Sequence, residues 1–159
     1  TAITELSNIL RSSMQVEKME TVPLIQELNI VKDYLALEHM RFEERLQIEM
    51  DIDEDTLNQP IPPMMLQTLV ENAIKHGISK HINGGLIRII SDFKDNHHEL
   101  VVQNSGKLNG HIFNNEDGFG IKSTQDRLNL LYQGKANFTI IEIDGIVESR
   151  IKMPVATIL

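Results

Sequence analysis

The feature that most constrains the fold is that predicted strands follow one another directly, with only short turns between them. Four segments bounded by turn residues read as strands. They form two consecutive pairs, residues 86–93 with 99–104 and residues 137–143 with 147–153. Asp144-Gly145 between the second pair is a strong signal for a tight hairpin. Because these strands are joined without an intervening helix, a mixed sheet is favoured over a doubly wound parallel sheet.

The remaining segments read as one more strand and several helices. Leu46 to Ile52 alternates apolar with polar residues, which predicts a half-buried strand. Apolar residues at helical spacing predict helices at about 6–14, 23–44, 63–76 and 121–132. Pro23 suits a first helical turn, and Gly77 is predicted to cap the helix that ends at His76. The order predicts an α/β fold of two layers, a mixed sheet with helices on one face.

Composition and charge exclude several classes of protein. The chain has 159 residues, 41% hydrophobic and 24% charged, which indicates a soluble globular domain. A net charge of −8 argues against non-specific binding to nucleic acid or an anionic membrane. The absence of cysteine excludes disulfides and a cysteine-based zinc site. No apolar run approaches the roughly 18 residues of a membrane span. The start at Thr1, without an initiator methionine or signal peptide, suggests a piece of a longer protein.

The predicted helix at 63–76 carries the most chemistry. Its apolar residues fill one broad face, and its polar residues, Thr68, Glu71, Asn72 and Lys75, crowd onto the opposite arc. His76 lies one turn beyond Asn72. An amide oxygen, a carboxylate and an ammonium group side by side could bind Mg²⁺ and a phosphate. The alternative is a solvated polar face, which the spacing alone favours.

Two glycine-containing segments could complete a ligand site. Asp117-Gly118-Phe119-Gly120 opens into the predicted helix at Ile121, where free backbone N–H groups could meet phosphate. Asn104-Ser105-Gly106 follows a strand, and Asn104 could hydrogen-bond a nucleobase. Either segment alone is equally well explained as a surface loop or turn.

The three segments, in this order, resemble the ATP-binding domain of the GHKL superfamily, and most closely its LytS-like sensor histidine kinases. Pro62 to Gln67 running into Val70-Glu71-Asn72-Ala73-Ile74-Lys75-His76-Gly77 is similar to the N box of that branch. Gly118 to Ile121, with Arg127-Leu128, is similar to its glycine box and the helix that follows. Upstream, residues 6–42 resemble the segment that links the histidine-bearing hairpin to the catalytic domain.

The resemblance implies a Bergerat-type fold that holds ATP and Mg²⁺ beneath a lid at about residues 107–117. It implies that Asn72 ligates the metal and that Glu71, Asn72 and Lys75 form the catalytic group. The nucleotide contacts that it implies are Asn72, Lys75, His76, Asn104, Gly106, Gly118, Phe119, Gly120, Ile121 and Arg127. It divides the chain into a helical linker at 1–44 and an ATP-binding domain at 45–159.

Four positions depart from the superfamily pattern. Asn104 stands where an aspartate usually accepts a hydrogen bond from the adenine amine; an amide can accept that bond, but without charge assistance. Thr68 stands where other branches carry Asn or Glu, which weakens a gyrase-like or chaperone-like ATPase interpretation. Leu108 replaces an expected glycine, and Ile146-Val147 replaces a common Gly-Thr pair.

The family's Asn-Pro-His-Phe phosphoacceptor motif does not occur in this sequence. His39 lies on a predicted helix, but its neighbours do not fit an acceptor box, so we interpret it as a surface or interface residue. His97-His98 is interpreted as a polar strand edge, since a metal site would need further ligands. The phosphoacceptor helix is therefore expected upstream of Thr1.

Two functions of different classes remain open. The first is a histidine kinase catalytic domain that transfers the γ-phosphoryl group of ATP to that upstream histidine. Its partners would be the histidine-bearing helix, in a homodimer, and a response regulator, and it would be the cytoplasmic part of an inner-membrane sensor. The second is a degenerate, non-enzymatic signalling or dimerisation module that keeps the GHKL fold.

Overall fold

The computed structural model describes residues 21–106 and 119–155. For residues 119–121 it describes the helical backbone and not the side chains. The predicted helix at 6–14 and the predicted lid at 107–117 lie outside this part of the chain. The helices are α2 (Leu24–Phe42), α3 (Met65–His76) and α5 (Phe119–Tyr132), with short 3₁₀ helices η1 (Glu43–Arg45), η2 (Glu54–Thr56) and η3 (Ile78–Lys80). The strands are β1 (Val22–Pro23), β2 (Leu46–Ile52), β3 (Pro60–Ile61), β4 (Gly85–Lys94), β5 (His97–Ser105), β6 (Asn137–Ile143) and β7 (Ile146–Pro154).

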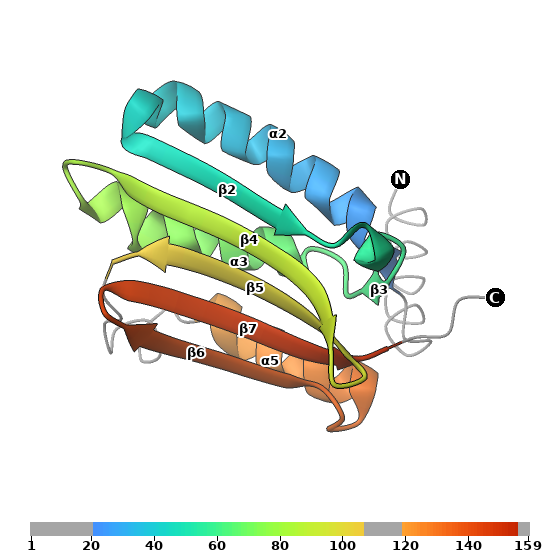
Figure 1. Cartoon of the computed structure of the whole chain (residues 1–159). Coiled ribbons are helices and arrows are strands. Elements are labelled where there is room, and N and C mark those ends of the chain that lie inside the picture. The colour runs from blue at the N-terminus through green and yellow to red at the C-terminus, as the bar shows by residue number, and fades with distance from the viewer. Residues whose placement is uncertain (1–20, 107–118, 156–159) are drawn as a thin grey trace, which may run out of the picture.

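Five strands form one mixed sheet in the order β2-β4-β5-β7-β6. β2 runs parallel to β4, and every other neighbouring pair is antiparallel. Helices α2, α3 and α5 all lie on the same side of this sheet (Figure 1). α2 contacts β2, α3 contacts β5 and α5 contacts β6, so the helical layer spans the sheet from edge to edge. The predicted two-layer α/β fold is confirmed.

Both predicted hairpins are present, and their turns explain why Asp, Asn and Gly stand there. Asp95 and Asn96 both have positive φ, at 52° and 63°, and so do Asp144 and Gly145, at 52° and 79°. Two successive positive φ values are required by a type I′ turn, whose twist matches that of the flanking strands. β4, β5 and β7 reach one or two residues further toward the turns than predicted, because ladder pairing continues up to the turn residues.

The hydrophobic core lies between the helices and the sheet. Its helical part comes mainly from α2 and α3, and its sheet part mainly from alternate residues of β4 and β5. These residues include Leu24, Leu28, Val31, Leu35, Met65, Leu66, Leu69, Val70, Ile87, Ile89, Leu100 and Val102. Burying one such side chain contributes about 1.5–3 kcal/mol. Because α2 supplies part of this core, residues on both sides of position 44 share one core. The functional division into a linker at 1–44 and an ATP-binding domain at 45–159 stays a prediction.

The start of α2 is held by backbone contacts that the sequence did not indicate. Val22–Pro23 pairs with Pro60–Ile61 in a two-residue antiparallel ladder. The amides of Leu24 and Ile25 donate to the carbonyls of Gln59 and Leu57, both at 3.0 Å. The first N–H groups of a helix have no partner within the helix, and α2 has no side-chain cap. The segment between β2 and β3, residues 53–59, therefore takes the place of the cap.

His98 corrects one sequence interpretation. It was expected at a polar strand edge, but its side chain faces the core and is 1% exposed. Its Nε2 lies 2.7 Å from Ser91 Oγ, which donates to Thr56 Oγ1, and Thr56 in turn donates to the Asp53 carbonyl. Burial lowers the pKa of His98 to about 4. A histidine can lie in the core because this chain of hydrogen bonds gives its buried Nε2 a polar partner. No sequence pattern indicated these hydrogen bonds.

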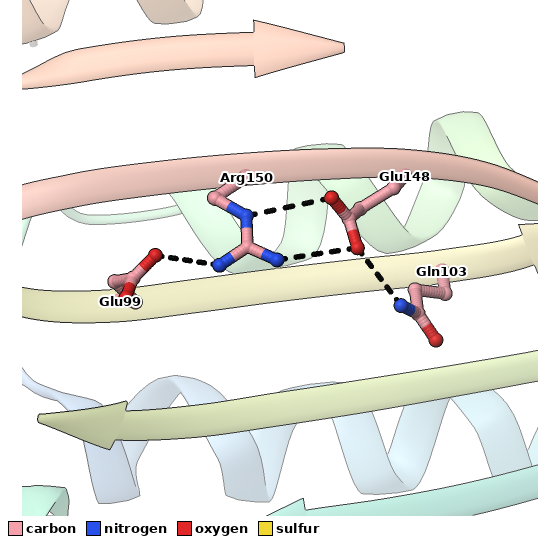
Figure 2. Close-up of polar contacts among 4 residues, drawn as sticks. All are labelled: Glu99, Gln103, Glu148 and Arg150. Atoms are coloured by element: carbon pink, nitrogen blue, oxygen red, sulfur yellow. Dashed lines mark hydrogen bonds and ion pairs between the residues drawn. The ribbon is translucent and has the colours of Figure 1, made fainter. Parts of the chain in front are cut away.

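The other face of the sheet carries a network of charged side chains, shown in Figure 2. Arg150 of β7 binds Glu99 of β5 at 2.5 Å and Glu148 of its own strand at 3.3 Å. Gln103 donates to Glu148 at 2.9 Å. The Glu99 side chain is 2% exposed, so its charge depends on the guanidinium beside it.

Among the described residues, no helix is long and apolar enough to cross a membrane.

Candidate functional site

Helix α3 begins two residues later than predicted, at Met65, because the backbone of Met64 breaks the helical path. Met64 has φ 64° and ψ 4°, a left-handed conformation that an α-helix cannot include. The side chain of Thr68 donates to the Met64 carbonyl at 2.8 Å, and the amide of Thr68 donates to the same oxygen. The predicted apolar face of α3 is buried. Its polar arc is thereby fixed on the side away from the core.

The polar arc of α3 is split between two environments. Glu71 is exposed and accepts a hydrogen bond from Gln67 Nε2 at 3.0 Å. Asn72 is half-buried, and its Nδ2 has no hydrogen-bond partner among the described residues although that atom is buried. Lys75 is exposed at the next turn, and His76 is half-buried. The fold thus leaves the buried amide nitrogen of Asn72 without a hydrogen-bond partner among the described residues.

Tyr34 of α2 adjoins the polar arc, and sequence reasoning missed it. Burial raises the pKa of Tyr34 to about 12, with further contributions from the negative charges of Glu38 and Glu71. Tyr34 also hydrogen-bonds Glu38, one turn further along α2. The spacing of Tyr34 and Glu38 was visible in the sequence, but only the packing of α2 on α3 brings Tyr34 within the electrostatic influence of Glu71.

The C-terminal end of α3 lies against the end of β5. Gly77 has φ −105°, so it is not the left-handed cap that the sequence predicted. Its lack of a side chain has another cause: a Cβ at this position would lie 2.2 Å from Asn104 Nδ2 and 2.7 Å from the Ala73 carbonyl. Gly77 therefore allows Asn104 to approach the helix end. The structure brings together the N-box helix and Asn104, which are 27 residues or more apart in the sequence.

Asn104 is held in place by the strand around it. It is 7% exposed, pairs with Ile87 of β4 and Val147 of β7, and donates from Nδ2 to the Ser105 carbonyl at 3.0 Å. The hydroxyl of Ser105 accepts from the Leu86 amide at 3.0 Å. Gly106 has φ 144°, a conformation that favours glycine, and its amide donates to the Gly145 carbonyl at 2.8 Å.

Arg127 of α5 has a partner within the fold. Its Nη2 donates to the carbonyl of Pro63, just before α3. Burial lowers the pKa of Arg127, while the nearby carboxylate of Glu27 raises it. These contacts join α5 to the start of α3 and to α2. A nucleotide contact by Arg127 stays a prediction.

The glycine box is described only in part. Gly118 lies outside the described residues, and Phe119, Gly120 and Ile121 form the first turn of α5, two residues earlier than predicted. α3 and α5 are in contact, so the start of this helix belongs to the same layer as Asn72.

This fold is shared with the catalytic domains of histidine kinases. The catalytic domain of histidine kinase ThkA matches with a TM-score of 0.63 at 14% identity, over 85% of this chain and 95% of that one. Identity this low shows the fold alone.

Sequence comparison gives the family. The family model described as Histidine kinase matches residues 1–46. Sensor histidine kinase/phosphatase LytS of Staphylococcus aureus (strain MRSA252) is 34% identical over 139 residues, 82% of this chain and 24% of that protein. The protein YwpD of Bacillus subtilis (strain 168) is 38% identical over 104 residues, 64% of this chain and 37% of that protein. The chain belongs to the LytS-like sensor histidine kinases of the GHKL superfamily, and it spans well under half the length of these relatives.

Proposed function

We propose that this domain binds ATP with Mg²⁺ and transfers the γ-phosphoryl group to a histidine on a helix outside this chain. The observation that carries the proposal is the close approach of the C-terminal end of α3, at Gly77, to Asn104 near the end of β5. Asn72 lies five residues before Gly77, about 7.5 Å along a helix. A nucleotide whose base lies against Asn104 and Gly77 would direct its phosphates toward Asn72 and Lys75.

The residues of the arc suit a magnesium nucleotide. Mg²⁺ prefers oxygen ligands and keeps phosphate oxygens in its shell, and the amide oxygen of Asn72 is a ligand of that kind. The amide nitrogen of Asn72 has no hydrogen-bond partner among the described residues. Lys75 would attract the phosphates, and Glu71, held by Gln67, would orient the groups around them. When bound, the metal would neutralise charge that develops on the transferring phosphoryl group. Transfer then needs mainly positioning from the protein.

The nucleotide contacts proposed for His76, Gly106, Gly118, Phe119, Gly120, Ile121 and Arg127 follow from the resemblance to the family. Helix α5 would place backbone N–H groups of its first turn near phosphate. Residues 107–117 would form the lid. The histidine-bearing helix, in a homodimer, and a response regulator would be the protein partners of an inner-membrane sensor whose cytoplasmic part includes this domain.

Isothermal titration with ATP, with and without Mg²⁺, tests the first half of the proposal. We expect saturable, magnesium-dependent binding at micromolar to millimolar nucleotide. No heat of binding at several millimolar ATP, from protein with an intact melting transition, would contradict it.

A non-enzymatic module is the second candidate, and the neutral Asn104 is the observation that favours it. A longer chain that includes an upstream Asn-Pro-His-Phe segment distinguishes the two. A kinase would become labelled from γ-³²P-ATP on that histidine. A longer chain that binds ATP and stays unlabelled, beside a related kinase that labels under the same conditions, would establish the module instead.

A further inference from the structure

We propose that Glu27 of α2 is a positioning residue for the glycine box, because its buried carboxylate holds the Arg127 guanidinium on the Pro63 carbonyl and so fixes α5 against the start of α3. Phe119 and Gly120 of the glycine box lie in the first turn of α5. This inference rests on the nucleotide site proposed above and deepens it, because it names what holds the glycine-box helix in place. Arg127 thereby has a role within the fold that is separate from the nucleotide contact proposed for it.

Glu27 is a buried acid without a complete set of partners. It is 2% exposed, and its buried Oε1 has no hydrogen-bond partner among the described residues. A carboxylate in this position is costly unless positive charge lies near it. Glu27 stands in the first turn of α2, at the positive end of the helix dipole. Arg127 supplies a second positive group: burial lowers the pKa of its guanidinium, and the Glu27 carboxylate raises it.

The backbone brings the two side chains to one place. Val22–Pro23, immediately before α2, pairs with Pro60–Ile61. The first turn of α2 therefore lies beside the segment that leads into α3. Arg127 reaches the same segment from α5, where its Nη2 donates to the carbonyl of Pro63, two residues after β3. Three parts of the chain that are far apart in the sequence thus meet at the entry to α3.

This meeting point can set the spacing of α3 and α5. Pro63 is followed by Met64, whose left-handed backbone makes α3 begin at the next residue. Arg127 lies eight residues after Phe119, about 12 Å along α5. A guanidinium has five donors in one plane, so a carboxylate near it restricts its orientation. Without the carboxylate, a small rotation of α5 about Arg127 would move its first turn relative to Asn72 of α3.

Hydrogen exchange of the nucleotide-free chain tests the positioning by itself. Glu27→Gln keeps the shape of the side chain and removes its charge. We expect the backbone amides of α5 to exchange about threefold or more faster in this variant than in the wild-type chain, because α5 opens locally more often. The amides of β4 and β7 should keep their wild-type rates. Glu44→Gln, the same change at an exposed residue, should leave the exchange of α5 unchanged.

ATP titration tests the consequence for the nucleotide site. Glu27→Gln should weaken ATP binding about threefold to tenfold, the usual size of a coupling that acts through another residue. Glu27→Asp keeps the charge and should lose less affinity. In an Arg127→Gln chain, Glu27→Gln should have no further effect, because Glu27 acts through Arg127. Each chain is titrated well below its melting transition, so that a loss of affinity does not come from unfolding.

Unchanged exchange of α5 in Glu27→Gln would overturn the inference. So would a loss of ATP affinity that is as large in the Arg127→Gln chain as in the wild-type chain, or a larger loss in Glu27→Asp than in Glu27→Gln. If the wild-type chain binds no ATP, the proposed function fails, and the exchange rates still decide whether Glu27 holds α5. If Glu27→Gln does not fold, Arg127→Lys gives the same exchange comparison, since an ammonium group does not reproduce the fork of a guanidinium.

Discussion

Asn72, Gly77 and Asn104 show how much of the proposed site rests on single residues whose neighbours come from elsewhere in the chain. The buried Nδ2 of Asn72 lacks a hydrogen-bond partner among the described residues. Gly77 and Asn104 fit one another, and a methyl group at Gly77 would occupy the place of the Asn104 amide. In the proposed function, Asn72 places one side-chain amide for a metal and Asn104 places another for a base.

Asn72→Ala should abolish magnesium-dependent ATP binding and leave the melting temperature within a few degrees of wild type. The reason is that the Asn72 side chain gives the described fold no hydrogen bond from its Nδ2, so the fold loses little with it. Titration calorimetry beside a thermal melt measures both. Asn58→Ala, on an exposed loop, is the matched control and should bind as wild type does. If Asn72→Ala unfolds the domain, Asn72 is structural and its proposed role is wrong.

Gly77→Ala should weaken ATP binding at least tenfold and lower stability by about 1–3 kcal/mol, the usual cost of overpacking. The backbone conformation at φ −105° accepts alanine, so the cost comes from the contact with Asn104 and with the Ala73 carbonyl. A double-mutant cycle with Asn104→Ala separates the two contacts. The stability cost should shrink in the Asn104→Ala background; an unchanged cost would assign the whole effect to the Ala73 carbonyl.

At the scale of elements, the two faces of the sheet carry different kinds of contact. On the helical face, β5 ends in Asn104 against α3. On the open face, the same strand carries Glu99, which Arg150 of β7 neutralises, while Arg88 of β4 binds Glu49 of β2 at 2.6 Å (Figure 2 shows the first of these pairs). The two pairs differ in exposure, the first being partly buried and the second open to solvent.

Arg150→Met should destabilise the domain by about 3–5 kcal/mol, because it leaves the buried Glu99 carboxylate without its cation. Arg88→Met is the matched control, since its side chain and that of Glu49 are 43% and 50% exposed, and it should cost no more than about 1 kcal/mol. Urea denaturation of both variants gives the comparison. Adding Glu99→Gln to Arg150→Met should recover part of the loss. Equal costs for the two arginine variants would show that burial of Glu99 has no energetic consequence.

At the scale of the whole molecule, one core joins the α2 segment, the sheet and the 53–59 segment. α2 buries Leu24, Leu28, Val31 and Leu35 against the same cluster as the sheet, and the carbonyls of Leu57 and Gln59 hold its first turn. His98 connects β5 to β4 and to this segment through Ser91 and Thr56. The pH dependence of global stability should therefore report on His98.

The free energy of unfolding should fall as the pH is lowered from about 6.5 to about 4, and His98 should account for up to about 1.4 kcal/mol per pH unit. The pKa of His98 is about 4 in the folded protein and near 6.5 when unfolded, so in this window the unfolded chain binds one more proton. Above pH 6.5 both states are neutral at His98 and this contribution vanishes. His98→Phe should reduce the slope; the same slope in wild type and variant would show that His98 is not the group responsible.

Comparing sequence with structure, the elements and their order were predictable because they depend on local patterns. The alternation in 46–52, the Asp144-Gly145 turn and the apolar face of α3 each act over a few residues, and the structure confirms them. The ends of the elements were less predictable. The left-handed backbone of Met64 makes α3 begin at Met65, and nothing in the sequence Pro62-Pro63-Met64-Met65 requires that conformation. The β1–β3 pairing escaped notice because two-residue strands carry no periodicity.

By itself, the sequence determined the mixed sheet, the amphipathic N-box helix and the family, because periodicity, turn chemistry and motif spacing are properties of neighbouring residues. The tertiary structure alone decided which side chains meet. It set Gly77 against Asn104, turned the amide of Asn104 toward the Ser105 carbonyl, placed Tyr34 beside Glu71 and buried His98 in the core. Such contacts join residues that are distant in the chain or depend on the packing around them, and they follow from how helices and strands pack, which no local pattern encodes.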